Sequence, residues 1–365
     1  MSSSSEEKKL KQQNPTPTLP DEILRSCIAK LSKLYYPTLS LVSKSFRSLL
    51  ASPELYIARS LSGHTESCLY VCLESSSGSR WFTLCLKPDK NKDDVSKNKN
   101  KKSYVLSKVP TLHSPPAVFS GLVSVGSDIY NIRSSSNVSV LDCRSHTWRK
   151  APSLPLQLMA LSACVVDEKI YVAGIHGESL KNSSKVLDTR KSSWNHVVSI
   201  PCRMTRRGVL NMVSVCVDGK PHVATDGRVV CYDSEGGKWD VGKTKMGSFW
   251  FSDSYCGVEN VLYSVYNGKF RWYDGEVNVW RGVEGLVGMP KFLPGVSVRL
   301  CDYGGKMIVV WDENMLSSGE NKIWCAEIEL ERRGGSEIWG EVEWIDHVLT
   351  VPIGYYIVKA LSVTV

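Results

Sequence analysis

Cysteine and histidine are the residues of this chain whose spacing could most readily reveal chemistry. The 365 residues include twelve cysteines, and none of them forms a Cys-x-x-Cys pair. Cys68 and Cys72 lie four apart in an alternating strand pattern, which is typical of buried strand residues rather than of a metal site. The seven histidines show no metal-ligand spacing: His64, His113, His146, His176, His196, His222 and His347. We interpret the cysteines as buried, reduced structural thiols and expect no metal or cofactor.

Short catalytic signatures are also missing. The chain contains no Gly-x-Ser-x-Gly elbow, no phosphate-binding loop ending in Gly-Lys-Ser/Thr and no His-Glu-x-x-His helix. These absences favour a protein that is not an enzyme. An active site assembled from several repeats would leave no such signature and stays an alternative.

The clearest spacing is a repeated Asp that precedes a Trp by six residues. The pairs are Asp142 and Trp148, Asp188 and Trp194, Asp233 and Trp239, and Asp274 and Trp280. Successive Trp residues lie 46, 45 and 41 apart, a period typical of propeller blades. We expect the Asp to set the turn before the last strand of each unit and the Trp to stack between units.

The ends of the repeat array predict a closed ring. Residues 67–109 offer strands but lack an initial one, and the strand-like tail 356–365 has no partner of its own. Pairing these two segments removes both exposed edges. The sequence therefore predicts an all-β propeller over 67–365 with six blades, the last running from about 298 to 347.

Residues 19–62 have helical periodicity instead. Apolar residues recur three or four apart, and Pro20, Pro37 and the Ser52-Pro53 pair mark three helix starts. Three short helices bury too little surface to be stable alone, so the segment should dock on something. A binding module and a helical cap on the β domain are equally compatible with this pattern.

The amino-acid sequence of this segment resembles an F-box. The resemblance covers the Leu-Pro start at Leu19 and Pro20, the stretch 36–49 and the stretch 52–56. It implies binding to the Skp-like adaptor of SCF ubiquitin ligases through Leu19, Pro20, Ile23, Leu24, Leu39, Val42 and Phe46. Phe46 stands where many F-boxes have Trp, which keeps an aromatic plug of smaller size.

The repeats resemble kelch repeats, as in the strand 169–174 that follows a turn. The double glycine of that family is reduced here to Ala173-Gly174. F-box plus kelch resembles the plant F-box/kelch-repeat family, which implies a small all-α F-box of three helices followed by an all-β kelch-type propeller. The implied function is the substrate-recognition subunit of an SCF E3 ligase, which reaches cullin through the adaptor and binds an unknown protein target. A kelch scaffold in a non-ligase complex is the alternative.

The remaining segments are polar. Residues 1–18 contain no apolar run and are expected to be disordered, and the Lys-rich stretch 87–102 reads as a solvated loop. Lysines without interleaved aromatic residues argue against nucleic-acid binding despite the net charge of +8. With no apolar run of membrane length, we expect a soluble protein of cytoplasm or nucleus. Candidate target-recognition loops are 133–137, 175–182 and 312–320.

Overall fold

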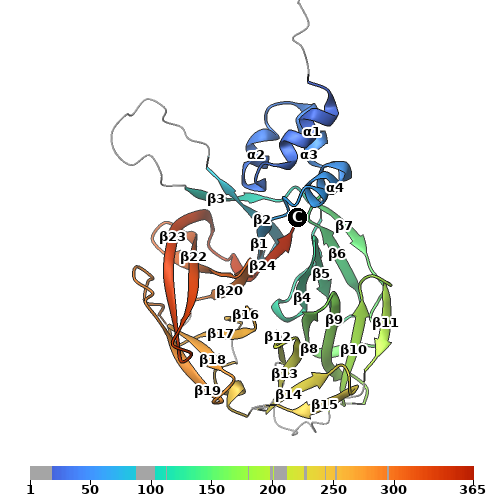
Figure 1. The fold of residues 1–365 in the computed structure, drawn as a ribbon, viewed down its shortest axis with the longest axis vertical. Helices are drawn as coiled ribbons and strands as arrows, with labels where there is room; N and C mark the ends of the chain where they lie inside the picture. The colour runs from blue at the N-terminus through green and yellow to red at the C-terminus, as the bar shows by residue number, and fades with distance from the viewer. Residues whose placement is uncertain are drawn as a thin grey trace, which may run out of the picture.

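The computed structural model describes residues 19–87, 103–111, 113–179, 181–197, 200, 212–225, 228–242, 244–250, 253–293 and 296–365. The tail 1–18 and, apart from Lys87, the Lys-rich loop 87–102 lie outside the described residues. Figure 1 shows a group of helices seated on a ring of sheets.

The helical segment differs from the three predicted helices. It contains α1 (Asp21–Ala29), the 3-10 turn η1 (Lys33–Tyr35), α2 (Tyr36–Leu39), α3 (Lys44–Leu50) and α4 (Pro53–Leu61). The expected second helix is split because the Ser43 side chain accepts a hydrogen bond from the backbone N–H of Phe46 (3.1 Å) and caps a new helix. Ser52 caps α4 in the same way. A capping serine inside an apolar stripe therefore outweighed the continuous periodicity.

Five sheets follow the helices. The first has the order β24-β1-β2-β3, with β1 (Ser67–Ser75), β2 (Gly78–Leu86), β3 (Tyr104–Lys108) and β24 (Tyr356–Thr364). The second contains β4 (Leu122–Val125), β5 (Asp128–Ile132), β6 (Val138–Asp142) and β7 (Thr147–Lys150). The third contains β8 (Leu158–Val166), β9 (Lys169–His176), β10 (Asn182–Asp188) and β11 (Ser193–His196). The fourth contains β12 (Val213–Val217), β13 (Lys220–Thr225), β14 (Arg228–Asp233) and β15 (Lys238–Val241).

The fifth sheet has eight strands. Its members are β16 (Tyr255–Val258), β17 (Val261–Tyr266), β18 (Lys269–Asp274), β19 (Val279–Glu284), β20 (Val298–Tyr303), β21 (Lys306–Met315), β22 (Glu320–Arg333) and β23 (Glu337–Pro352). Two meanders of four strands are joined where β19 and β23 pair in parallel, at Val283 with Ile338 and Glu284 with Trp339. The hairpin β22–β23 is longer than any other, which lets its tip reach the neighbouring meander.

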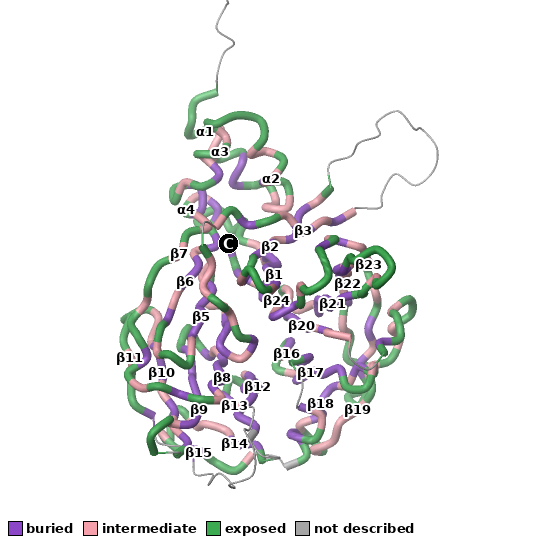
Figure 2. The backbone as a smooth tube through the Cα atoms, turned by 180° about the vertical axis from the view of Figure 1, so that it is seen from behind, coloured by how far each residue is buried: buried purple, intermediate pink, exposed green. Residues whose placement is uncertain are grey.

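The sheets surround a common centre. In Figure 1 the first strands of the meanders lie toward the middle of the ring and the last strands, such as β11 and β19, lie at its outside. Buried residues concentrate along the inner and middle strands, whereas turns and outer strands are exposed (Figure 2). This is the layout of a β-propeller.

The repeated Asp and Trp residues have the predicted structural roles. Each Asp carboxylate accepts a hydrogen bond from a backbone N–H two or three residues later, as Asp142 does from Arg144 at 2.9 Å. Trp148 packs edge-on against Trp81 of the neighbouring sheet, with ring centroids 6.3 Å apart. The indole N–H of Trp280 donates to the carbonyl of Lys245 at 3.0 Å, which ties an outer strand to the preceding connection.

The C-terminal strand closes the ring, as predicted. β24 pairs antiparallel with β1 along most of its length. Beyond that register, Glu66 and Val365 exchange two backbone hydrogen bonds of 3.0 Å. The last residue of the chain is therefore held beside the point where the helical segment enters the first sheet.

Candidate protein-binding surface

The helical segment exposes an unusual share of large apolar side chains. Of eighteen such side chains exposed among the described residues, eight belong to the helices and their turns: Leu19, Ile23, Leu31, Tyr35, Leu41, Val42, Ile57 and Leu61. The segment is much shorter than the propeller, so the enrichment is strong. Exposed apolar side chains gathered on a small module are typical of a surface that binds another protein.

The predicted adaptor-binding residues fall into two groups. Leu19, Pro20, Ile23 and Val42 are exposed. The other three, Leu24, Leu39 and Phe46, are half-buried and pack against the core that the helices share with the propeller. The first group is open to a partner, whereas the second supports the helices from beneath.

Leu41 is an exposed residue that sequence reasoning did not single out. Its side chain is 77% exposed, beside Val42 at 63%. Both lie in the turn between α2 and α3, after the Ser40 C-cap and before the Ser43 N-cap. A continuous helix would have turned Leu41 away from the stripe that carries Val42, so only recognition of the Ser43 cap could have found it.

Arg59 of α4 holds the helical segment together from inside. Its guanidinium is buried and donates to the carbonyl of Ala29 (3.1 Å), the hydroxyl of Tyr36 (3.1 Å) and the carboxylate of Glu66 (2.9 Å). The same carboxylate accepts from the backbone N–H of Lys33. One buried cation therefore links α4, the end of α1 and the residue that precedes β1.

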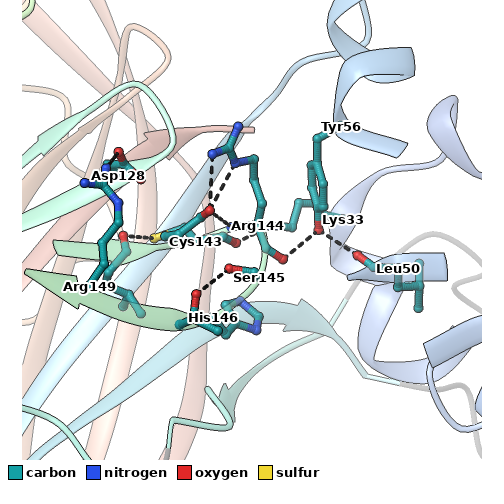
Figure 3. A network of polar contacts seen from close by, with 12 residues as sticks. Lys33, Leu50, Tyr56, Asp128, Cys143, Arg144, Ser145, His146 and Arg149 are labelled. Atoms are coloured by element: carbon teal, nitrogen blue, oxygen red, sulfur yellow. Dashed lines mark hydrogen bonds and ion pairs between the residues drawn. The ribbon is translucent and has the colours of Figure 1, made fainter. Parts of the chain in front are cut away.

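A second network joins the helices to the turn between β6 and β7. The Tyr56 hydroxyl lies within hydrogen-bond distance of the Leu50 carbonyl (2.9 Å) and the Arg144 carbonyl (3.2 Å), as Figure 3 shows. The Lys33 ammonium donates to the carbonyl of Cys143 at 3.0 Å. Burial raises the pKa of the Tyr56 hydroxyl, so it remains a proton donor. The helices are thus docked on the propeller at this turn.

The ends of the inner strands that lie away from the helices surround a cavity. The helices contact the end of the ring where β24 finishes and where Thr364 donates to the Gly126 carbonyl. A cavity of about 330 Å³ lies at the other end, lined by residues at the starts of the six innermost strands, among them Phe119, Leu161, Val213, Asp253, Arg299 and Tyr356. Because all six innermost strands contribute to its wall, this cavity lies at the centre of the ring, and we call it the channel mouth.

Two cationic side chains near this cavity connect neighbouring strands through hydrogen bonds. The Arg299 guanidinium donates to the carbonyl of Val358 at 2.7 Å. The Lys359 ammonium donates to the carbonyls of Phe119 (3.0 Å) and Leu122 (2.8 Å) and lies 4.3 Å from the centroid of the Phe119 ring. Burial lowers the pKa of Lys359 to about 8. These contacts satisfy a backbone carbonyl of β24 itself and two carbonyls at the start of β4 and in the turn before it.

A wider groove of about 680 Å³ lies near the same end. Phe292, Trp311 and Trp324 supply its aromatic wall, and the two indoles stack at 6.2 Å. The loop 312–320 borders it, and Leu293 beside it is exposed. The loops 133–137 and 175–182 likewise connect the second and third strands of their sheets, at the strand ends away from the helices; residue 180 lies outside the described residues.

Two kinds of feature are absent from the part of the chain that the structure describes. Among these residues no group of three or more His, Cys, Asp or Glu side chains could hold a metal ion. No described helix is long and apolar enough to cross a membrane. The geometry provides a docked helical module with exposed apolar residues and a propeller with a cavity at its far end.

The arrangement is thus a small helical module docked on a β-propeller, and comparison with known families identifies the two parts. The F-box domain family matches residues 17–58. The family described as FKB95, Kelch-repeats domain, matches residues 81–349, which is most of the chain. The chain belongs to the F-box/kelch-repeat proteins.

Relatives from Arabidopsis thaliana support this assignment over nearly the whole length. The chain is 52% identical to F-box/kelch-repeat protein At5g51250, with 94% of this chain and 99% of the relative covered. It is 46% identical to F-box/kelch-repeat protein At4g39550, with 96% and 94% covered. It is similarly related, at 50% identity, to putative F-box/kelch-repeat protein At5g38680, with 96% of both chains covered.

Proposed function

We propose that this protein is the substrate-recognition subunit of an SCF-type E3 ubiquitin ligase. The F-box binds a Skp-like adaptor, and through it cullin, while the kelch propeller binds the protein to be ubiquitinated. The exposed apolar residues of the F-box are the observation that carries this proposal. The reaction then needs only proximity, because the recruited conjugating enzyme meets the target at high effective concentration. No residue of this chain has to react, and the protein acts in cytoplasm or nucleus without a cofactor.

The adaptor contacts centre on the exposed group Leu19, Pro20, Ile23 and Val42, to which we add Leu41. Leu24, Leu39 and Phe46 contribute at their exposed edges and hold the helices in place. A charge at Leu24 would therefore confuse loss of folding with loss of binding. Leu41 and Val42 are better positions for a test because their side chains project into solvent.

The target is proposed to bind at the propeller end away from the F-box. The channel mouth, the groove walled by Trp311 and Trp324, and the three candidate loops all lie toward that end. We also infer six blades, by counting the eight-stranded sheet as two meanders joined through β19 and β23. In a six-bladed ring, each of the six innermost strands belongs to a different blade.

Direct binding to a purified plant Skp-like adaptor tests the F-box part. The double substitution Leu41→Asp and Val42→Asp should weaken binding by about a hundredfold or more, since each aspartate would be buried without a partner at an apolar interface. Leu316→Asp is the matched control, because Leu316 is equally exposed but lies on the propeller. Equal affinity of the double variant and the parent would refute the proposed interface.

Target binding is tested separately from adaptor binding. Leu293→Asp, beside the aromatic groove, should reduce recovery of co-purifying target proteins while adaptor binding is unchanged. The alternative function, a kelch scaffold in a non-ligase complex, predicts that adaptor or target is recovered without cullin. The presence of cullin in the purified complex separates the two.

A further inference from the structure

A pocket between the F-box and the propeller is not used by either proposed protein interface. It has a volume of about 440 Å³ and lies between η1, α2 and α3 on one side and β2, β3 and the β6–β7 turn on the other. Ligand pockets in proteins commonly measure 300–1,000 Å³. The pocket is therefore large enough for a small organic molecule.

Most of the pocket wall is hydrocarbon. Leu34, Pro37, Leu50, Leu84, Val109 and Pro110 all line it. Thr83 and Ser107 add hydroxyl groups from the propeller side. An apolar wall with a few polar groups is the usual composition of a site that buries the body of a small ligand and fixes its orientation.

The charged residues of the wall are mostly cationic. Lys33, Arg47, Lys108 and Arg144 line the pocket against one carboxylate, that of Glu66. This carboxylate is already paired with the buried Arg59 at 2.9 Å. Arg47 and Lys108 are exposed at the pocket and have no ion-pair partner among the described residues. The electrostatic field in the pocket thus favours an anion.

His146 adds an imidazole ring that a hydrogen bond holds in place. The Tyr70 hydroxyl lies 3.0 Å from the Cys143 carbonyl and 2.9 Å from Nε2 of His146. Tyr70 and Nε2 of His146 therefore share a hydrogen bond, whose donor depends on the tautomer of the ring. Burial lowers the pKa of His146 to about 4, so the ring is neutral near pH 7. Figure 3 shows this turn beside Tyr56 and Lys33.

We propose that this pocket binds a small organic anion with an apolar body. The body would lie against the wall around Leu34, Leu50 and Leu84, and the anionic group would face Arg47 and Lys108. Such a ligand touches the F-box and the propeller at once. Its binding would stabilise the junction between the adaptor-binding and target-binding parts.

The dye 8-anilinonaphthalene-1-sulfonate is a suitable probe because it combines an aromatic body with a sulfonate. Titration of the full chain should give saturable fluorescence, and the uncharged analogue N-phenyl-1-naphthylamine should bind about tenfold more weakly. Arg47→Glu combined with Lys108→Glu should weaken binding of the sulfonate about tenfold or more, by reversing two charges. Ser107→Trp, which fills the pocket from β3, should abolish it in a chain whose circular dichroism is unchanged.

The matched control is Lys44→Glu combined with Lys150→Glu. These lysines are also exposed, one on the F-box and one on the propeller, but neither lines the pocket. Equal loss of dye binding in this control would show that only net charge matters and would overturn the proposal. Loss of binding on Leu41→Asp and Val42→Asp would overturn it too, because it would place the dye on the exposed apolar residues of the F-box. Full dye binding by a folded Ser107→Trp chain would also overturn the proposal.

Discussion

Ring closure by the C-terminal strand makes a quantitative prediction at Ile357. This β24 residue is 0% exposed and pairs with Leu73 of β1, which is also fully buried. Ile353, four residues earlier in the turn before β24, is 47% exposed. The two positions carry the same side chain and differ mainly in whether the strand pairing buries it.

Ile357→Ala should destabilise the folded chain by about 2–5 kcal/mol, the cost of removing a buried Ile side chain and leaving a cavity. The entropy of unfolding scales with chain length, and a domain of about 300 residues gives about 0.6 kcal/mol per kelvin. A loss of about 3 kcal/mol therefore lowers the melting temperature by about 5 °C. Ile353→Ala should shift it by only about 1 °C.

Calorimetry of the two purified variants against the parent measures these shifts. Deletion of 357–365 extends the test, because it removes all the partners of the free edge of β1 except Tyr356 and should abolish cooperative unfolding of the propeller. Equal melting temperatures for Ile357→Ala and Ile353→Ala, or an unchanged transition after the deletion, would show that β24 does not close the ring.

Three further predictions concern buried charges. The pKa of Lys359 is lowered to about 8, so from pH 8 to 10.5 this side chain is neutral in the folded protein but still protonated in the unfolded chain. Across that range, folding of the parent relative to Lys359→Met should become about 3 kcal/mol more favourable, as measured by denaturant titration. The pKa of His146 is lowered from 6.5 to about 4, so the side chain takes up a proton more readily in the unfolded chain. As the pH falls from 6.5 to 4, the free energy of unfolding of the parent should therefore fall by up to about 3 kcal/mol relative to that of His146→Asn. Asn suits the positive φ of 56° at this position. Arg59→Met should cost about 3–5 kcal/mol, because it leaves the Glu66 carboxylate without its cationic partner and the Ala29 carbonyl without this donor. Hydrogen exchange in α1 and α4 should become faster, whereas the exposed Arg47→Met should change neither.

Much of the fold could be predicted from local sequence because its devices are local. The Asp residues of the repeats bond the backbone within three positions, and turns such as Asp167-Glu168 adopt positive φ at both residues, as tight hairpins require. The pairing of β24 with β1 followed from counting strands that lacked partners. The turns depend on contacts between near neighbours in the sequence, and the pairing of β24 with β1 depends on closure of the ring. Both could be predicted without coordinates.

Other features depend on contacts that spacing does not reveal. The join between β19 and β23 arises from the length of the β22–β23 hairpin; Gly334-Gly335 marks its turn, but not how far the tip of the hairpin reaches. The exposure of Leu41 depends on the helix break at Ser43, a capping signal hidden inside an apolar stripe. The pocket beside His146 exists only because residues more than a hundred positions apart, such as Lys33 and Cys143, meet at the junction of the two parts.

Affinity purification of the full chain from plant cells, with the proteasome inhibited, tests the central claim most directly. We expect the parent chain and Leu316→Asp to recover both a Skp-like adaptor and cullin. Leu41→Asp combined with Val42→Asp should recover neither, while the same propeller-bound proteins remain. Recovery of the adaptor and cullin by all three chains, or absence of cullin from the parent complex, would contradict the assignment as an SCF substrate-recognition subunit.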